Sequence, residues 1–208
     1  CCDAGVKKVV FPSSGGTVYG EPTSIPIRES DPVSPVHPYA ISKVAIEMYL
    51  RSFSTLYGLD YLILRYSNPY GERQMPFGSQ GVIPIFLAAI MEGKSPVVYG
   101  DGSMLRDYIY IGDLVEGTLA LLQKNTSEKI FNVGSGEGTS VHDLLEIMEE
   151  VLCRPVLPVF SNPPGMYISR IVLDISRITA CTGWRPEVSL HEGIERTSRW
   201  MQTHLFSV

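Results

Sequence analysis

Two groups of residues in this sequence have the types and spacing needed for proton transfer. Tyr39 and Lys43 stand four positions apart, so on a helix their phenol and ammonium share one face. A cation beside a phenol favours the deprotonated form and makes the tyrosine a usable general base. The pair also recurs by chance on helix surfaces, where it is only solvated. Its surroundings must decide between the two interpretations.

The second group is Ser13 and Ser14, directly after the apolar run Val9 to Pro12. The run is typical of a buried strand, and open α/β sheets bind ligands at the carboxyl ends of their strands. A serine hydroxyl there can bond both a substrate hydroxyl and the oxygen of Tyr39. The sequence therefore predicts that helix and strand meet at one site.

Apolar runs of strand type alternate with segments of helical period, which predicts an α/β protein with parallel strands. The expected strands lie around 9–12, 61–66, 97–98, 108–111 and 129–133. The expected helices cover 39–57, 82–92, the segment of Leu114, Leu119 and Leu122, a segment ending at Cys153, and 190–204. The first helix is expected from its apolar positions Ile41, Val44, Ala45, Met48, Leu50 and Phe53.

Local signals define the ends of several elements. Gly58 stands where the helix 39–57 should end. Asp113 is the expected N-cap of the helix that carries Leu114, Leu119 and Leu122. Ser140 and Asp143 both offer side chains to the open N–H groups of the helix that reaches Cys153. Pro, Ser and Asp predict a loop over 21–38, and 67–71 is expected to be a turn.

Composition excludes several classes of protein. With 208 residues, 44% hydrophobic content and a net charge of −5, the chain can form a real core and has no basic stripe for nucleic acid. Its longest apolar stretches are about half of the roughly 20 residues that span a membrane. The four cysteines and four histidines lack metal-ligand spacing, so we expect no metal site. The few, scattered cysteines indicate reduced thiols and a cytoplasmic location. We expect surface or loop positions for His37, His142, His191 and His204.

Four ordered motifs carry a resemblance that covers nearly the whole chain. They are residues 11–20 (FPSSGGTVYG), the Tyr39/Lys43 pair, residues 64–71 (LRYSNPYG) and residues 105–109 (LRDYI). Together they resemble UDP-glucose 4-epimerase and its relatives among the extended short-chain dehydrogenases/reductases. The resemblance implies a partial Rossmann-like, doubly wound parallel sheet over 1–75 and a small α/β substrate-binding domain over 76–208. Residues 111–133 would return to the first part.

The resemblance also implies a role for each matching residue. Tyr39 would exchange the proton of the sugar 4-hydroxyl while the C4 hydride moves to NAD, and Lys43 would bond the nicotinamide ribose. Ser14 would complete the proton relay, with Ser13 as the alternative. The implied cofactor contacts are Pro12, Ser13, Tyr39, Lys43, Tyr66 and Pro69. The implied UDP-sugar contacts are Ser14, Asn68, Val82, Tyr99, Arg106 and Arg170, the arginine at 106 pairing with the diphosphate.

Some of these residues also have purely structural interpretations. Asn68-Pro69 can be only a turn, and Arg106-Asp107 only a local ion pair. Residues 134–138 (GSGEG) follow a strand and precede a helix, like a dinucleotide fingerprint, but the third glycine comes one place early. We interpret that segment as a structural loop.

The chain departs from the family pattern in two places. The Gly-x-x-Gly-x-x-Gly turn that seats the NAD pyrophosphate is absent, so we expect the chain to be the C-terminal two-thirds of a longer enzyme with an open sheet edge. Residues 162–167 (NPPGMY) stand where relatives usually carry Arg-x-Gly-Asp, which leaves Arg170 as the candidate phosphate contact. We expect very weak NAD binding and no turnover by these residues alone.

The sequence favours C4 epimerisation of a UDP-hexose and leaves two alternatives open. A 4,6-dehydratase would carry an Asp-Glu pair just before Val18-Tyr19-Gly20, where this chain has Gly16-Thr17. A non-catalytic binding or scaffold protein would explain the missing cofactor motif, but not the retained Tyr39, Lys43 and Ser14. The family resemblance also implies a homodimer through the helix 39–57.

Overall fold

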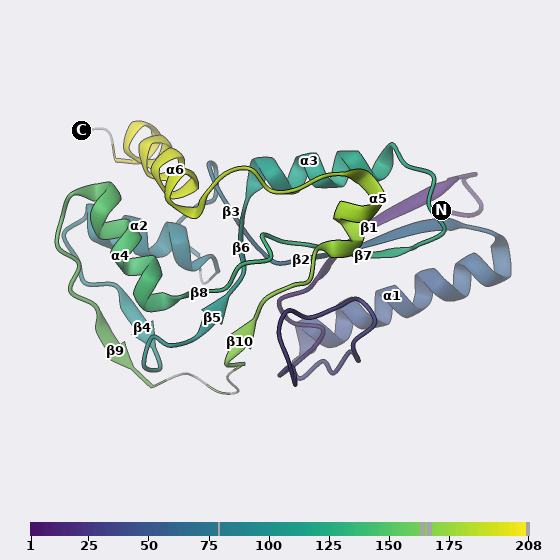
Figure 1. The fold of residues 1–208 in the computed structure, drawn as a ribbon, viewed down its shortest axis with the longest axis horizontal. Helices are drawn as coiled ribbons and strands as arrows, with labels where there is room; N and C mark the ends of the chain where they lie inside the picture. The colour runs from purple at the N-terminus through teal and green to yellow at the C-terminus, as the bar shows by residue number, and fades with distance from the viewer. Residues whose placement is uncertain (79, 163–164, 166–167, 207–208) are drawn as a thin grey trace.

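The computed structural model describes residues 1–78, 80–162, 165 and 168–206. Two halves share the chain, and Figure 1 shows them side by side. One half is a parallel sheet with helices on both faces, and the other gathers three helices around shorter strands. The predicted α/β class with parallel strands is confirmed.

The sheet of the first half has the order β1-β2-β7, with β1 at Lys8–Ser14, β2 at Asp60–Tyr66 and β7 at Ile130–Val133. Both pairings are parallel. The helix α1 (Pro38–Tyr57) covers one face of this sheet, and α3 (Ile111–Leu122) and α5 (Ser176–Thr182) cover the other (Figure 1). Among the described residues, β1 is an edge strand, so one row of its backbone groups has no strand partner.

The central strand β2 explains how the two faces are packed. Leu62 and Leu64 point to the α3 face, where they share a buried cluster with Phe131 and other apolar residues. Arg65, the next residue, points to the α1 face. A strand buried on both faces reads as a continuous apolar run, so a buried arginine in it requires a partner.

The second half combines short strand pairs with three helices. The pairs are β3 (Asn68–Tyr70) with β6 (Tyr108–Tyr110), and β4 (Val97–Tyr99) with β9 (Val159–Ser161). A three-stranded sheet has the order β10-β5-β8, at Arg170–Ile171, Leu105–Arg106 and Thr139–Ser140. The helices are α2 (Val82–Met91), α4 (Val141–Leu152) and α6 (Leu190–His204), and their apolar faces pack into one buried cluster.

Helix ends agree with the local signals in most places. Gly58 ends α1 in the left-handed region at φ 68°, and Ser140 with Asp143 forms a complete capping box on α4. Asp113 does not cap α3, contrary to expectation. That helix begins at Ile111, and the buried Asp113 carboxylate accepts a hydrogen bond from Val188 N at 3.0 Å instead.

The predicted turn at 67–71 is also wrong, because its residues Asn68–Tyr70 form β3. Asn68 N donates to Asp107 O at 2.9 Å, so a partner 39 residues away extends the backbone that local composition would bend. A long-range pairing thus overrides the turn signal of Asn-Pro.

The apolar positions of α1 are divided between its inner and outer sides, with Leu50 buried and Val44 packed against a buried cluster. Ile41, Met48 and Phe53 are exposed, whereas Ala40, Glu47 and Leu50 are the buried residues. A large apolar surface therefore remains on the outside of this helix. No helix among the described residues is both long and apolar enough to cross a membrane.

Candidate active site

A cavity of about 630 Å³ lies where the two halves meet, and it brings half of the predicted site together. Its lining includes Ser14, Tyr39, Asn68, Pro69, Val82 and Arg106. The carboxyl end of β1 and the N-terminal ends of α1, α2 and α4 all reach it. Of these helices, α2 has no side-chain cap at Gly81, so its first N–H groups and positive dipole end favour an anionic ligand.

The start of α1 positions Tyr39 at the mouth of this cavity. His37 is the N-cap residue, and its Nδ1 accepts a hydrogen bond from Ala40 N at 3.4 Å. Its ring stacks with that of Tyr39 at a centroid distance of 6.4 Å. Tyr39 is 51% exposed, so its phenol is accessible to a ligand. His37 lies in the loop before the helix, as expected, and it also caps α1 and lines the cavity; the other three histidines are exposed.

Lys43 lies one turn beyond Tyr39 and bridges the helix to β1. Its Nζ donates to Pro12 O at 2.7 Å and lies 5.5 Å from the centre of the Tyr39 ring. It also lies over the Phe11 ring at 4.9 Å. The ammonium is thus held between the strand and the phenol, although it does not itself line the cavity.

The two serines at the end of β1 have different surroundings. Ser13 is buried, and its Oγ donates to Glu47 Oε1 at 2.5 Å. Ser14 lines the cavity, and its Oγ accepts from Thr17 Oγ1 at 2.9 Å. Of the two serines, Ser14 is therefore the one that lines the cavity, because the hydroxyl of Ser13 is engaged inside the protein.

Glu47 belongs to a buried polar network that the sequence analysis missed. Its carboxylate forms a two-pronged ion pair with Arg65, at 3.1 Å from Nε and 2.7 Å from Nη2. Arg65 Nη1 in turn donates to Tyr19 Oη at 3.0 Å, and Tyr19 donates to Asn132 Oδ1 at 2.7 Å. Burial raises the pKa of Tyr19 to about 12, so this tyrosine stays a neutral donor. The network ties α1 to β1, β2 and β7.

Two further predicted contacts, Asn68 and Arg106, reach the cavity from β3 and β5. Asn68 Nδ2 donates to Asp107 O at 3.0 Å, which leaves its other amide atom, Oδ1, near Gly16. Arg106 donates to Leu105 O and Ile168 O, both at 2.8 Å. Both side chains line the same hollow as Ser14 and Tyr39.

Several predicted contacts do not line this cavity: Pro12, Ser13, Lys43, Tyr66, Tyr99 and Arg170. Tyr66 Oη bonds Thr118 Oγ1 at 2.9 Å, and burial raises its pKa. Tyr99 and Arg170 are exposed on β4 and β10. The segment that replaces Arg-x-Gly-Asp lies largely outside the described residues.

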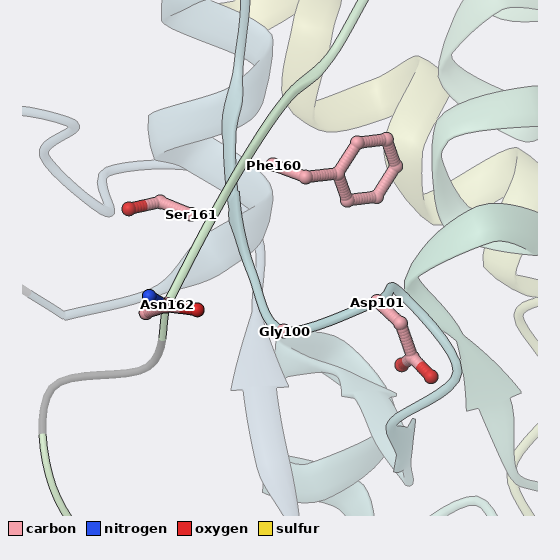
Figure 2. A pocket seen from close by; sticks show the side chains of 5 residues that line it. All are labelled: Gly100, Asp101, Phe160, Ser161 and Asn162. Carbon is pink, nitrogen blue, oxygen red and sulfur yellow. The ribbon is translucent and has the colours of Figure 1, made fainter.

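A second hollow, of about 690 Å³, lies at the ends of β4 and β9. Figure 2 shows that Phe160 and Asp101 lie on one side of the backbone there, whereas Ser161 points to the other. Side chains that point apart do not converge on one ligand. We therefore place the candidate site in the first cavity.

The loop after β7, residues 134–138, is structural, as interpreted from the sequence. Ser135 N and Gly136 N donate to the Asp107 carboxylate at 2.8 and 3.2 Å. Burial raises the pKa of Asp107, and these donors oppose the rise. An internal carboxylate thus occupies the N–H groups that a dinucleotide fingerprint would offer to a phosphate.

Comparison with known proteins identifies the family. The model of the NAD dependent epimerase/dehydratase family matches residues 1–134. The chain belongs to this family. It is 41% identical to a UDP-glucose 4-epimerase of Mycolicibacterium smegmatis, over 93% of this chain and 62% of the relative. It is also 42% identical to a dTDP-4-dehydro-6-deoxyglucose reductase of Escherichia coli, over 92% of this chain and 60% of the relative.

The fold agrees with the same family. The crystal structure of the Thermotoga maritima UDP-glucose 4-epimerase with UDP-glucose has a TM-score of 0.93 and 38% identity. The match covers 98% of this chain and 66% of that structure. The chain thus has the Rossmann-like fold of these enzymes, and it spans 60–62% of the length of the two curated relatives.

Proposed function

We propose that this chain is the catalytic and nucleotide-sugar-binding part of an NAD-dependent epimerase that inverts C4 of a UDP-hexose. The observation that carries the proposal is the single cavity shared by Tyr39, Ser14, Asn68 and Arg106. A general base, a hydroxyl partner and an anion-binding arginine are the groups that such a reaction needs.

Each residue has a defined role in the proposal. Tyr39 Oη removes the proton of the sugar 4-hydroxyl and later returns it, while Ser14 Oγ bonds the same oxygen. Lys43, held at Pro12 O beside the phenol, stabilises the deprotonated form. Tyr39, Lys43 and Pro69 would hold the nicotinamide end of NAD, which would supply reversible hydride transfer at C4 of the sugar. Tyr66 and Pro69 remain predicted nicotinamide contacts, and Tyr99 and Arg170 remain predicted nucleotide contacts.

The diphosphate of the substrate is proposed to lie between Arg106 and the N-terminus of α2. Gly81, the N-cap residue of that helix, provides no side-chain acceptor for its first N–H groups. Val82, a predicted substrate contact, is the first residue of the helix and lines the cavity. Open N–H groups beside a guanidinium form a site for a diphosphate.

The cavity favours epimerisation over 4,6-dehydration. A dehydratase moves protons at C5 and C6 with carboxyl groups, whereas the described residues that line the cavity include no Asp or Glu. Thr17 stands at the relevant place and bonds Ser14. A non-catalytic role would not require Tyr39, Lys43 and Ser14 to remain together.

The residues present fit NAD only in part. Tyr39, Lys43 and Pro69 offer the nicotinamide end its expected neighbours. Among the described residues, the glycine-rich loop after β7 is bound to Asp107, and the first turn of α1 is capped by His37. Neither offers the pyrophosphate the directed N–H donors of a Rossmann turn.

A homodimer through α1 is part of the proposal. Its exposed apolar side chains include Ile41, Met48, Tyr49, Leu56 and Tyr57. Contiguous apolar surface on a helix usually marks an interface. We also propose a cytoplasmic location, since all four cysteines are free thiols.

Two experiments test the function. Calorimetric titration of the 208-residue chain should show UDP binding but very weak NAD binding, and no turnover. Micromolar NAD binding, or turnover by these residues alone, would show that we misjudge what the cofactor half supplies.

The second experiment uses the polypeptide that adds the N-terminal third found in the relatives. It should interconvert UDP-glucose and UDP-galactose, followed by proton NMR, without net consumption of NADH. A 4-keto-6-deoxy product would establish the dehydratase instead. Tight binding of UDP and NAD without any turnover would establish the scaffold.

A further inference from the structure

The buried carboxylate of Asp107 lies beside the proposed diphosphate site but does not line the cavity. Its side chain is fully buried, and it accepts four hydrogen bonds from two separate segments. The donors are Ser135 N and Ser135 Oγ at 2.8 Å, Leu173 N at 3.1 Å and Gly136 N at 3.2 Å. The first segment follows β7 of the parallel sheet, and the second follows β10 of the substrate half. One side chain thus joins the two halves.

The fit around this carboxylate is close. A Cβ at Gly134 would stand 2.6 Å from Asp107 Oδ2, so only glycine allows the loop to approach this far. A fully buried carboxylate is costly unless several donors satisfy it. The loop 134–136 and Asp107 therefore hold each other in one arrangement.

This anchor acts directly on the residues of the cavity. Arg106 precedes Asp107, and side chains of neighbouring residues in extended backbone point to opposite faces. Fixing the Asp107 carboxylate on the buried side therefore directs Arg106 into the cavity, which it lines. The main chain of Asp107 also orients Asn68, since its carbonyl oxygen accepts from Asn68 N at 2.9 Å and from Asn68 Nδ2 at 3.0 Å.

We propose that Asp107 is a positioning residue for diphosphate binding, which it serves by fixing the direction of Arg106. The proposal rests on the proposed function, in which Arg106 contacts the diphosphate. Without the carboxylate, Arg106 is still present, but its side chain is no longer held in the direction of the diphosphate. The affinity for ligands that carry a β-phosphate should therefore fall. Affinity for ligands without a β-phosphate should change little.

The test compares UDP and UMP binding to the 208-residue chain by calorimetry. Asp107→Asn should weaken UDP binding about tenfold, less than Arg106→Ala, because the arginine remains available. Its UMP affinity should stay near that of the unaltered chain. In the double variant Arg106→Ala/Asp107→Asn, the fold-loss of UDP affinity should be much smaller than the product of the two single fold-losses. Both substitutions disable the same contact between Arg106 and the diphosphate.

A matched control separates positioning from general destabilisation. Asp113 is likewise buried and accepts a backbone N–H, from Val188, but it does not precede a predicted ligand contact. Asp113→Asn should lower the melting temperature and leave the ratio of UDP to UMP affinity unchanged. Should Asp107→Asn fail to fold, Ser135→Ala, which removes one of the four bonds, should give a smaller loss of the same kind.

The outcomes distinguish the two proposals. If Arg106→Ala binds UDP normally, the proposed function loses its diphosphate contact. If Arg106→Ala loses UDP while Asp107→Asn and Ser135→Ala bind it normally, the positioning role is overturned and the function stands. Equal losses of UDP and UMP, or fully multiplicative losses in the double variant, would also overturn the positioning role.

Discussion

Replacing Glu47 by leucine should expose how much the fold depends on the buried ion pair beneath the catalytic helix. Glu47 and Arg65 are each only 2% exposed, and the carboxylate receives two bonds from the guanidinium and one from Ser13. Glu47→Leu preserves much of the volume but leaves a buried, uncompensated cation. Removal of one partner of such a pair costs about 3–5 kcal/mol.

For a chain of this length, each kcal/mol lowers the melting temperature by about 2–4 °C. We therefore expect a decrease of about 6–20 °C, measured by circular dichroism and checked by urea unfolding. The double variant Glu47→Leu/Arg65→Met should recover most of this loss, because the unpaired charge disappears with its partner.

The control is the surface pair of Glu195 and Arg199 on α6, at 2.6 Å and largely exposed. Glu195→Leu should cost about 0.5 kcal/mol or less. A loss below about 1 kcal/mol for Glu47→Leu would refute the reasoning, since the pair would then behave like an exposed one. The reasoning would also be refuted if the stability losses of Glu47→Leu and Arg65→Met simply added in the double variant.

Two further predictions concern the reaction and the pH dependence of stability. In the polypeptide with the N-terminal third, Tyr39→Phe should lower kcat by about 10² to 10⁴ with unchanged UDP affinity, and near-normal turnover would contradict its role as the base. Hydrogen bonds from Ser140 hold the pKa of Asp143 below its usual range, so its stabilisation is present above the unfolded value near 3.9 and is lost as pH falls through the folded value. The melting temperature of Asp143→Ala should thus be lower than that of the unaltered chain at pH 7 and converge with it in acid; an equal difference at both pH values would contradict this.

Local sequence signals predict the ends of helices well where the capping groups are close in the chain. Gly58 and the Ser140/Asp143 box lie within a turn of the backbone groups that they satisfy. Asp113 misleads because its carboxylate bonds Val188, 75 residues away. The turn expected at 67–71 fails for the same reason, since β3 exists only through its pairing with β6. Structure that depends on groups close together in the sequence can be predicted from local signals. Structure that depends on a partner far along the chain cannot be predicted in this way.

The buried ion pair did leave a signal in the sequence. Arg65 ends the apolar run Leu62-Ile63-Leu64, and Glu47 lies seven positions after Ala40, on the face of α1 that turns out to be buried. A charge inside an apolar pattern requires an opposite charge nearby. Of the apolar positions from which this helix was expected, Leu50 is buried and Val44 packs against a buried cluster, whereas Ile41 and Met48 lie on the outer surface.

The loop after β7 shows why the two halves of the proposed site differ. Its glycines and open N–H groups have the local form of a phosphate-binding turn, yet those donors hold the carboxylate of Asp107. The same carboxylate directly follows Arg106, which lines the cavity and whose direction we propose that Asp107 fixes. In the role that we propose for Asp107, a loop with the form of a phosphate-binding turn is used internally, and it helps to position Arg106 for the diphosphate of the substrate. The residues of the cavity, with Ser14, Tyr39, Asn68 and Arg106 among them, thus come from this chain, whereas the N–H groups of Ser135 and Gly136 are not open to a phosphate of the cofactor.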